Sequence, residues 1–320
     1  MKRKMKSLLG VLLAAMLCLT ACADTSVKDV AVMKIDGQEI MKSEYMVYLY
    51  TTTKSFVSAA GEDVWNMDFD GQSADELVEE RTINTIQSVI AAKEYAAANG
   101  IALTEEQKAA AAAAADQFMQ GASAEDLQKM NIDVKKLQPL MEDSYLYTLV
   151  YQEIAAECDV VESEVEEYYR ENGAQLKKDY TTLKLQTILL DDGEKAAEAA
   201  KRAKAGEDFL ALFEEYDIDS SVENGGEMTV YQNYLQTSFG LTEELEKGEV
   251  AGPLQLGEGW FILKAAEKNV PSDADVRELA ESQYRNEVHS AYTEARFSDM
   301  TKMQKVEKME ETWEGLEKFH

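Results

Sequence analysis

The sequence predicts an α+β fold, with helical regions on both sides of a segment that mixes strands and helices. Apolar residues recur at helical spacing through residues 40–176, which is typical of a series of packed helices. Residues 181–190 alternate between apolar and polar side chains as a half-buried strand does. A long helix is predicted after Pro271. Apart from a short N-terminal hairpin, strand structure is therefore expected in the second half of the chain, between helices.

The composition indicates a soluble globular protein with a strongly acidic surface. With 45% apolar residues the chain can form a sizeable core. Its length of 320 residues predicts about two domains. Its 61 acidic residues outnumber the 32 basic ones, and the formal charge is −29. A polyanion of this size is a poor binder of nucleic acid. The acidic surface is either simply solvated or attracts basic, unfolded chains.

The first 21 residues predict a signal peptide and hence export. Four basic residues precede the apolar run 8–19, which is too short to span a bilayer, since spanning takes about 20 residues. The run leads into Leu-Thr-Ala-Cys, ending at Cys22. These residues resemble the bacterial lipobox, in which the cysteine becomes the lipidated first residue of the mature chain. Two acyl chains suffice for a stable membrane anchor. The alternative is an ordinary secretory signal with a chance cysteine.

The cysteines predict a mature protein without an intrachain disulfide. Cys18 leaves with the signal peptide and Cys22 would carry lipid, so Cys158 remains alone. Cys158 is expected on an apolar helix, as a buried inert thiol rather than a nucleophile. His289 and His320 are the only histidines, too few for a zinc site or a histidine-based triad.

Local signals define the N-terminal elements. Asp36 and Gly37 form a turn signal between two short runs, which predicts a hairpin. Ser73 and Thr104 are each followed three residues later by Glu or Gln, a pattern that opens helices. The alanine run 109–115 is expected to continue the helix that begins at Thr104, because alanine is the best helix former.

The C-terminal region predicts two helices that pack back on the N-terminal ones. The helix after Pro271 is expected to run to about Met303. Four further apolar residues recur at 3-4-3 spacing, which predicts a last amphipathic helix: Val306, Met309, Trp313 and Leu316. The apolar face of a returning helix must be buried against another element, and the apolar faces of the N-terminal helices must be covered as well. The two sets of faces can bury each other.

Five motifs follow one another between residues 180 and 268. They are the strand 181–190, Gly206-Glu207-Asp208-Phe209, Asp219-Ser220-Ser221 with Asn224-Gly225-Gly226-Glu227-Met228, Gly248-Glu249-Val250-Ala251-Gly252-Pro253, and Gly259-Trp260-Phe261-Ile262-Leu263-Lys264. In this order and spacing they resemble the parvulin type of peptidyl-prolyl isomerase. The connector 161–176 and the hairpin-plus-helix opening resemble the PrsA and SurA foldases.

This resemblance implies a helical chaperone module, made of an N-terminal hairpin plus helices and completed by C-terminal helices, with an inserted parvulin-like βαααβαββ domain. The implied boundaries are 1–21 for the lipoprotein signal peptide, 22–30 for a tether, 31–176 for the SurA-N-like helical module, 177–269 for the parvulin-like domain and 270–320 for the C-terminal helices. The family needs no cofactor or metal.

The resemblance also assigns catalytic positions. In the family two histidines stack in the site, one in the first strand and one in the last. Those positions are Thr187 and Phe261 here, which cannot make the same mutual hydrogen bond. The acidic position near the amide carbonyl is Asp219. This aspartate could instead simply cap a turn, which aspartate favours.

Substrate-binding positions follow from the same resemblance. Met228 and Phe239 would cradle the proline ring, with Ser220 beside them. The alternative for Met228, and the commoner role for such a methionine, is an ordinary core residue. Phe239 is expected in a loop spanning residues 231–241, where binding residues are common.

The predicted function is that of a membrane-anchored, extracytoplasmic foldase. It would catalyse or assist cis-trans isomerisation of X-Pro bonds in exported polypeptides, its unfolded partners, and would not bind nucleic acid. The alternative is a non-catalytic holdase chaperone with a degenerate parvulin domain, which the missing histidines favour. A solute-binding lipoprotein is disfavoured, since two α/β lobes would need repeated strand–helix units.

Overall fold

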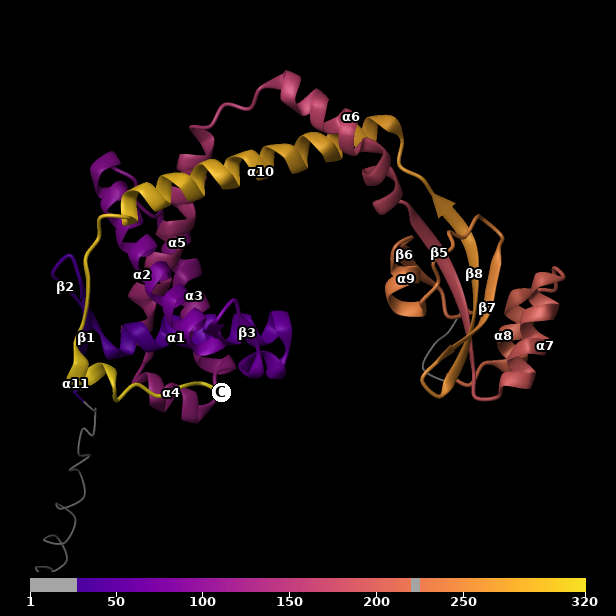
Figure 1. Ribbon diagram of the computed structural model, residues 1–320, viewed down its shortest axis with the longest axis horizontal. Coiled ribbons are helices and arrows are strands. Elements are labelled where there is room, and N and C mark those ends of the chain that lie inside the picture. Colours follow the sequence, from indigo (N-terminus) through magenta and orange to yellow (C-terminus); the bar gives the residue numbers. More distant parts are fainter. Residues whose placement is uncertain (1–27, 220–224) are drawn as a thin grey trace, which may run out of the picture. The chain divides into compact units, whose positions relative to one another are not determined.

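The structure is a computed structural model that describes residues 28–219 and 225–320 (Figure 1). The chain divides into two compact units. The first contains the described residues up to Ala155 together with Thr293–His320, and the second contains Ala156–Tyr292. Each unit has its own core, and each is described separately below.

The first unit begins with the predicted hairpin. Strands β1 (Ala31–Ile35) and β2 (Gln38–Met41) pair antiparallel. Asp36 and Gly37 connect them with φ of 49° and 83°, the left-handed pair that a type I′ turn requires. The turn prediction is therefore confirmed.

The predicted N-terminal helices are present. They are α1 (Lys42–Ala60), α2 (Ala74–Asn99), α3 (Glu105–Gly121), α4 (Ala124–Met130) and α5 (Val134–Ala156), with the short elements η1 (Glu62–Asn66), β3 (Asp68–Phe69) and β4 (Gln72–Ser73) between α1 and α2. Ser73 and Thr104 both make full capping boxes, so these two helix starts are confirmed. The alanine run lies inside α3, as expected.

The core of the first unit lies between the hairpin and the helices. It is built from fully buried aliphatic residues that include Ile35, Ile40, Met46, Ile86 and Leu137. The C-terminal residues complete it, because the Trp313 ring packs 4.8 Å from that of Tyr45 and the Phe319 ring 5.2 Å from that of Tyr50. The expected return of the C-terminus to the N-terminal module is confirmed.

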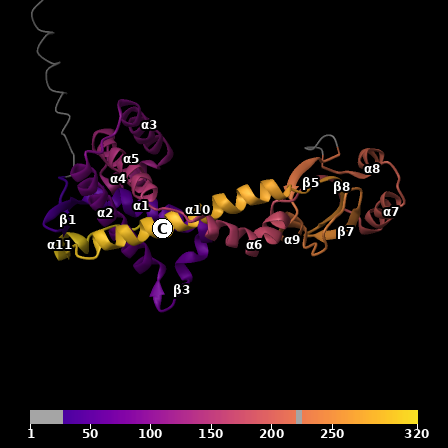
Figure 2. The same ribbon diagram turned by 90° about the horizontal axis from the view of Figure 1, so that it is seen from above.

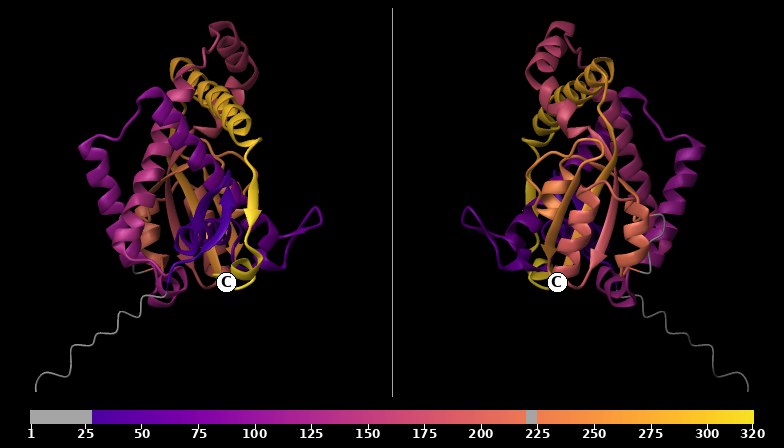
Figure 3. Two further views of the ribbon diagram at one scale, coloured as in Figure 1. Left: turned by 90° about the vertical axis from the view of Figure 1, so that its left-hand side faces the viewer. Right: turned by 90° about the vertical axis from the view of Figure 1, so that its right-hand side faces the viewer.

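The form of this C-terminal return differs from the prediction. The helix α10 (Asp273–Thr301) ends where expected, but Val306–Lys308 is a strand, β9, and α11 spans only Glu310–Trp313. β9 pairs antiparallel with β1 and gives the sheet order β2-β1-β9 (Figure 3). The prediction of one amphipathic helix is wrong because β1 offers an edge whose backbone groups need partners.

The second unit contains a helix pair and a four-stranded sheet. Helix α6 (Glu162–Asp179) packs against the first half of α10 through Leu176, Val276 and Ala280. Cys158 lies in the connection before α6 and is half-buried, so its expected place inside a buried helix is wrong.

The sheet is antiparallel, with strand order β6-β5-β8-β7. Its members are β5 (Thr182–Leu190), β6 (Met228–Tyr231), β7 (Val250–Leu256) and β8 (Gly259–Asn269), and the helices of this segment are α7 (Gly193–Lys204), α8 (Phe209–Tyr216) and α9 (Tyr234–Phe239). α7 and α8 cover one face and α9 the other (Figures 1 and 2). The described residues contain two helices between β5 and β6 where the predicted order has three; residues 220–224 fall in that interval.

The turn at Gly225 and Gly226 lies directly against β5. The N–H of Thr187 donates to the Gly225 carbonyl over 3.0 Å. Gly226 has a φ of +60°, and a Cβ there would sit 2.4 Å from Thr187 Oγ1 and 2.9 Å from the Thr187 carbonyl oxygen. Both the backbone conformation and the close approach require glycine at this position.

We expect Gly226→Ala to destabilise the protein far more than Gly240→Ala, which is a matched control. Gly240 also has a left-handed φ, of +65°, but open space surrounds its Cβ position. Gly240→Ala should therefore cost only the conformational penalty of about 1–2 kcal/mol, and Gly226→Ala at least twice as much. Urea unfolding followed by circular dichroism measures both. Equal losses would contradict the close packing of this turn on β5.

Candidate functional site

The two positions that carry histidines in parvulins lie on one face of the sheet. Thr187 is paired with Leu263, and Leu189 with Phe261, so Thr187 and Phe261 are diagonal neighbours on adjacent strands. Leu263 belongs to the core under α9, which identifies this face as the α9 side. Thr187 is half-buried, and its hydroxyl donates weakly to the Gly226 carbonyl over 3.4 Å.

The predicted cradle residues lie on the same face. Met228 opens β6 opposite Leu185, another member of the core under α9. Phe239 is the last residue of α9, and its ring contacts that of Phe261 edge-on with 5.6 Å between centroids. The structure thus brings the two rings into contact and places the Met228 thioether on the same face, on the strand at the other side of β5.

Two expectations about these side chains need correction. Met228 is 37% exposed, so it is not an ordinary core residue. Phe239 is 9% exposed and lies in a helix, so the predicted loop is wrong. Leu235 and Phe239 are one helical turn apart and both pack on the sheet, and Gly240 in left-handed conformation ends the helix.

Asp219 is held beside the end of β5 by a residue that the sequence analysis missed. The Asp217 carboxylate accepts hydrogen bonds from the N–H of Leu189 over 2.7 Å and from the N–H of Asp219 over 3.0 Å. The N–H of Ile218 donates to the Leu189 carbonyl over 3.0 Å. The chain at 217–219 is therefore fixed to the same strand that carries Thr187. An Asp-x-Asp spacing, typical of an Asx-turn, is the signal that could have pointed to Asp217.

The surroundings of Asp217 change the pKa of its carboxyl group. Burial raises the pKa of Asp217 above its usual value, and the nearby charge of Asp219 adds to that effect, while the two backbone N–H donors oppose it. Asp217 is thus a partly buried anchor whose hydrogen bonds orient the backbone at Asp219.

Two predicted functional residues lie outside the described residues, namely Ser220 and the lipidation residue Cys22. Within residues 28–219 and 225–320 no group of acidic, histidine or cysteine side chains is arranged to hold a metal ion. No helix in the same described ranges is both long and apolar enough to cross a bilayer.

The chain is similar in sequence to known foldases. Residues 160–281 match the family model of the PPIC-type PPIASE domain. The foldase protein PrsA of Caldanaerobacter subterraneus subsp. tengcongensis is 24% identical over 322 residues, covering 97% of this chain and 98% of the relative. The foldase protein PrsA of Oceanobacillus iheyensis is 30% identical over 152 residues, covering 45% of this chain and 44% of the relative.

Solved structures of foldases and chaperones also align with the chain. The foldase PrsA of Streptococcus pneumoniae aligns over 74% of this chain and 92% of its own, with 15% identity and a TM-score of 0.44. A SurA-like chaperone of Campylobacter jejuni aligns over 88% of this chain and 99% of its own, with 12% identity and a TM-score of 0.36. From its family match and its relatives, this chain carries a PPIC-type (parvulin) peptidyl-prolyl isomerase domain and is homologous to the PrsA foldases over nearly its whole length.

Proposed function

We propose that this protein is a membrane-anchored, extracytoplasmic foldase that assists cis-trans isomerisation of X-Pro bonds in exported polypeptides. One observation carries the proposal. Thr187, Phe261, Met228 and Phe239 share one face of the sheet, and Asp219 is fixed to the strand that carries Thr187. The family match over this segment and the near full-length similarity to PrsA support it.

The arrangement suits the chemistry of the reaction. The barrier to rotation of about 18–20 kcal/mol comes from amide resonance, so a catalyst must favour the twisted amide over the planar one. Met228 and the two rings of Phe239 and Phe261 supply an apolar surface that desolvates a proline ring. A carboxylate at Asp219, near the carbonyl oxygen of the substrate, disfavours the planar form in which that oxygen carries most negative charge.

A second candidate function is that of a holdase without turnover. The observation in its favour is Phe261, whose side chain has no polar atom and packs on the Phe239 ring. The Thr187 hydroxyl donates its hydrogen bond to the Gly226 carbonyl. Neither side chain can orient Asp219 as a pair of histidines could, so the catalytic rate is expected to be low.

We expect weak isomerase activity that depends on Asp219 and Met228. Asp219→Ala should lower the rate several-fold, since it removes the charge that acts on the twisted amide. Met228→Ala should weaken peptide binding, because it removes exposed apolar surface from the cradle. The measurement is NMR exchange on X-Pro peptides with acidic, basic and apolar X, using the purified mature chain.

Asp191→Ala is the matched control, an exposed aspartate that directly follows β5 and has no assigned part in the site. A robust rate that Asp219→Ala leaves untouched would overturn the site assignment. Complete lack of turnover, with intact suppression of client aggregation, would establish the holdase instead.

The anchoring proposal rests on the sequence that ends at Cys22. Cys22→Ser should release the protein from membranes or leave it unprocessed, because no thiol remains for lipid attachment. Cys18→Ser is the control, since that residue leaves with the signal peptide. Fractionation followed by mass spectrometry of the N-terminus measures both. A processed Cys22→Ser protein that stays in the membrane would rule out the lipid anchor.

We further propose that residues 177–269 form an inserted domain between host segments 31–176 and 270–320. In support, Thr182 and Asn269 are paired on neighbouring strands, so the two ends of the segment lie side by side. Just outside these ends, α6 packs on α10 through Leu176 and Val276. The two host segments therefore contact each other where the inserted domain leaves and rejoins them.

Joining residue 176 to residue 270 through a short linker should leave a folded helical protein. The expected result is a cooperative thermal transition and a helix-rich circular dichroism spectrum, because the core around β1 and β9 remains complete. The isolated 177–269 segment is the companion sample and should fold as well. Insertion would be the wrong description if both products were unfolded.

A further inference from the structure

A pocket of about 390 Å³ lies in the first unit, where α2, α5 and the C-terminal part of α10 meet. Three aromatic side chains line it, namely Tyr147 and Tyr151 from α5 and Phe297 from α10. Phe297 is 5% exposed, and the two tyrosines are half-buried. Close packing of the rings on one another alone would leave no space of this size, so the pocket is a distinct feature of this aromatic cluster.

The three rings form a compact triangle. The Phe297 centroid lies 5.0 Å from that of Tyr147 and 6.3 Å from that of Tyr151, and the two tyrosine centroids are 6.3 Å apart. The planes of Tyr151 and Phe297 are inclined by only 18°, and Tyr147 is tilted by 46° and 48° against its two neighbours. One cation above this triangle can therefore lie within about 6 Å of all three centroids, the range in which a ring face attracts a positive charge.

The charge on the wall of the pocket is negative. Glu294 is the single charged residue among the described residues that line it. Burial raises the pKa of the Tyr147 hydroxyl, and charge from Tyr151 and Glu294 adds to that effect, so the carboxylate lies close to the rings. The neutral polar side chains of the lining belong to Asn84, Ser88, Ser298 and Thr301.

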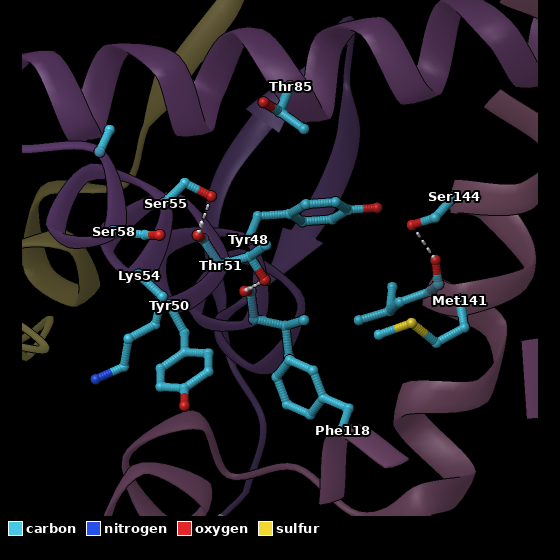
Figure 4. Close-up of a pocket in the computed structure, with 13 residues that line it drawn as sticks. Tyr48, Tyr50, Thr51, Lys54, Ser55, Ser58, Thr85, Phe118, Met141 and Ser144 are labelled. Carbon is cyan, nitrogen blue, oxygen red and sulfur yellow. Dashed lines mark hydrogen bonds between the residues drawn. The ribbon is translucent and has the colours of Figure 1, made fainter. Parts of the chain in front are cut away.

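A second hollow of the first unit carries the opposite charge. It lies among α1, α2, α3 and α5, and its lining includes the rings of Tyr48, Tyr50 and Phe118 (Figure 4). Lys54 is the single charged residue among the described residues of that lining, and its ammonium group repels another cation. The pocket beside α10 thus differs from this hollow in joining aromatic rings to a carboxylate.

This combination fits a quaternary ammonium group. Its positive charge is attracted both by ring faces and by a carboxylate. Its methyl groups are apolar and carry no N–H, so their burial against the rings leaves no hydrogen bond unmade. A primary ammonium would bring three N–H donors, which ring faces satisfy poorly. The formal charge of −29 on the whole chain also raises the local concentration of cations.

We propose that the pocket formed by Tyr147, Tyr151, Phe297 and Glu294 binds a quaternary ammonium group, carried either by a free solute or by a lipid headgroup. The methyl groups pack on the three rings, and the carboxylate balances the positive charge. The site lies in the helical unit and shares no residue with the proposed isomerase site, so it stands or falls separately from the foldase function.

The test follows the N-methyl proton signal of choline by NMR during titration with the full mature chain at low ionic strength. The chain is produced without residues 1–21, so that it carries no lipid. Ring currents should move the bound signal upfield. The neutral analogue 3,3-dimethylbutan-1-ol has the same shape without the charge and should bind at least about tenfold more weakly.

Variants of Tyr151 test the aromatic contact. Tyr151→Leu should weaken choline binding about three- to tenfold, because one ring face is lost. Tyr151→Phe keeps the ring and should bind choline within about twofold of the wild-type chain. An affinity that Tyr151→Leu leaves unchanged would overturn the assigned ring contact.

Glu294→Gln tests the carboxylate and does not disturb the core, because Glu294 is exposed. It should weaken choline binding about three- to tenfold through the loss of one nearby charge. Glu287→Gln is the matched control, since Glu287 is an exposed glutamate two turns earlier in α10 that does not line the pocket. It changes the net charge equally and should bind choline as the wild-type chain does.

A wild-type chain that leaves the choline signal unmoved, or that binds the neutral analogue as tightly as choline, would overturn the inference. Equal losses in Glu294→Gln and Glu287→Gln would also overturn it, because they would show general attraction of cations to an acidic protein. Cosedimentation with vesicles of phosphatidylcholine, compared with phosphatidylglycerol, distinguishes the two sources of the group. Phosphatidylcholine binding that Tyr151→Leu abolishes supports a headgroup site, and choline binding without vesicle binding supports a site for a free solute.

Discussion

The pairing of β5 with β8 is the constraint on which the second unit depends. It runs in continuous antiparallel register from Thr182–Asn269 to Leu190–Trp260, with one bulge. The register decides which side chains share a face, because a shift by one residue would move each side chain to the opposite side. Thr187 and Phe261 become neighbours only through it. The same pairing closes the segment at its ends, so that α6 and α10 can meet.

Features encoded by local signals could be predicted from the sequence. The turn at Asp36 and Gly37 and the helix starts at Ser73 and Thr104 each depend on residues no more than three apart, and all three are present. The motifs between residues 180 and 268 are also local signals, each recognisable from a few adjacent residues. Their order carried the resemblance to the family, and the resemblance in turn predicted how the strands pair in the sheet.

Features that depend on distant partners could not be predicted in this way. Val306 and Trp313 satisfy helical spacing, yet the edge of β1 makes Val306 part of a strand. The role of Asp217 depends on the N–H of Leu189, 28 residues away in sequence. The buried position of Phe239 depends on the apolar face formed by β5 and β8. In each case a long-range contact outweighs the local pattern.

The altered site must act within the time for which a client stays bound. Uncatalysed X-Pro isomerisation takes tens to hundreds of seconds. A client held with a Kd of about 1 μM and associating at about 10⁶ M⁻¹s⁻¹ stays bound for about one second. Holding alone would thus release a client many times before one bond isomerised.

An acceleration of about 10- to 100-fold would let one X-Pro bond isomerise while a client stays bound once. This acceleration requires only about 1.4–2.7 kcal/mol of preferential stabilisation of the twisted amide. A desolvating cradle and one oriented carboxylate can supply energies of that size. On this reasoning, loss of the histidine pair is compatible with a useful foldase, provided that client retention and slow catalysis act on the same polypeptide.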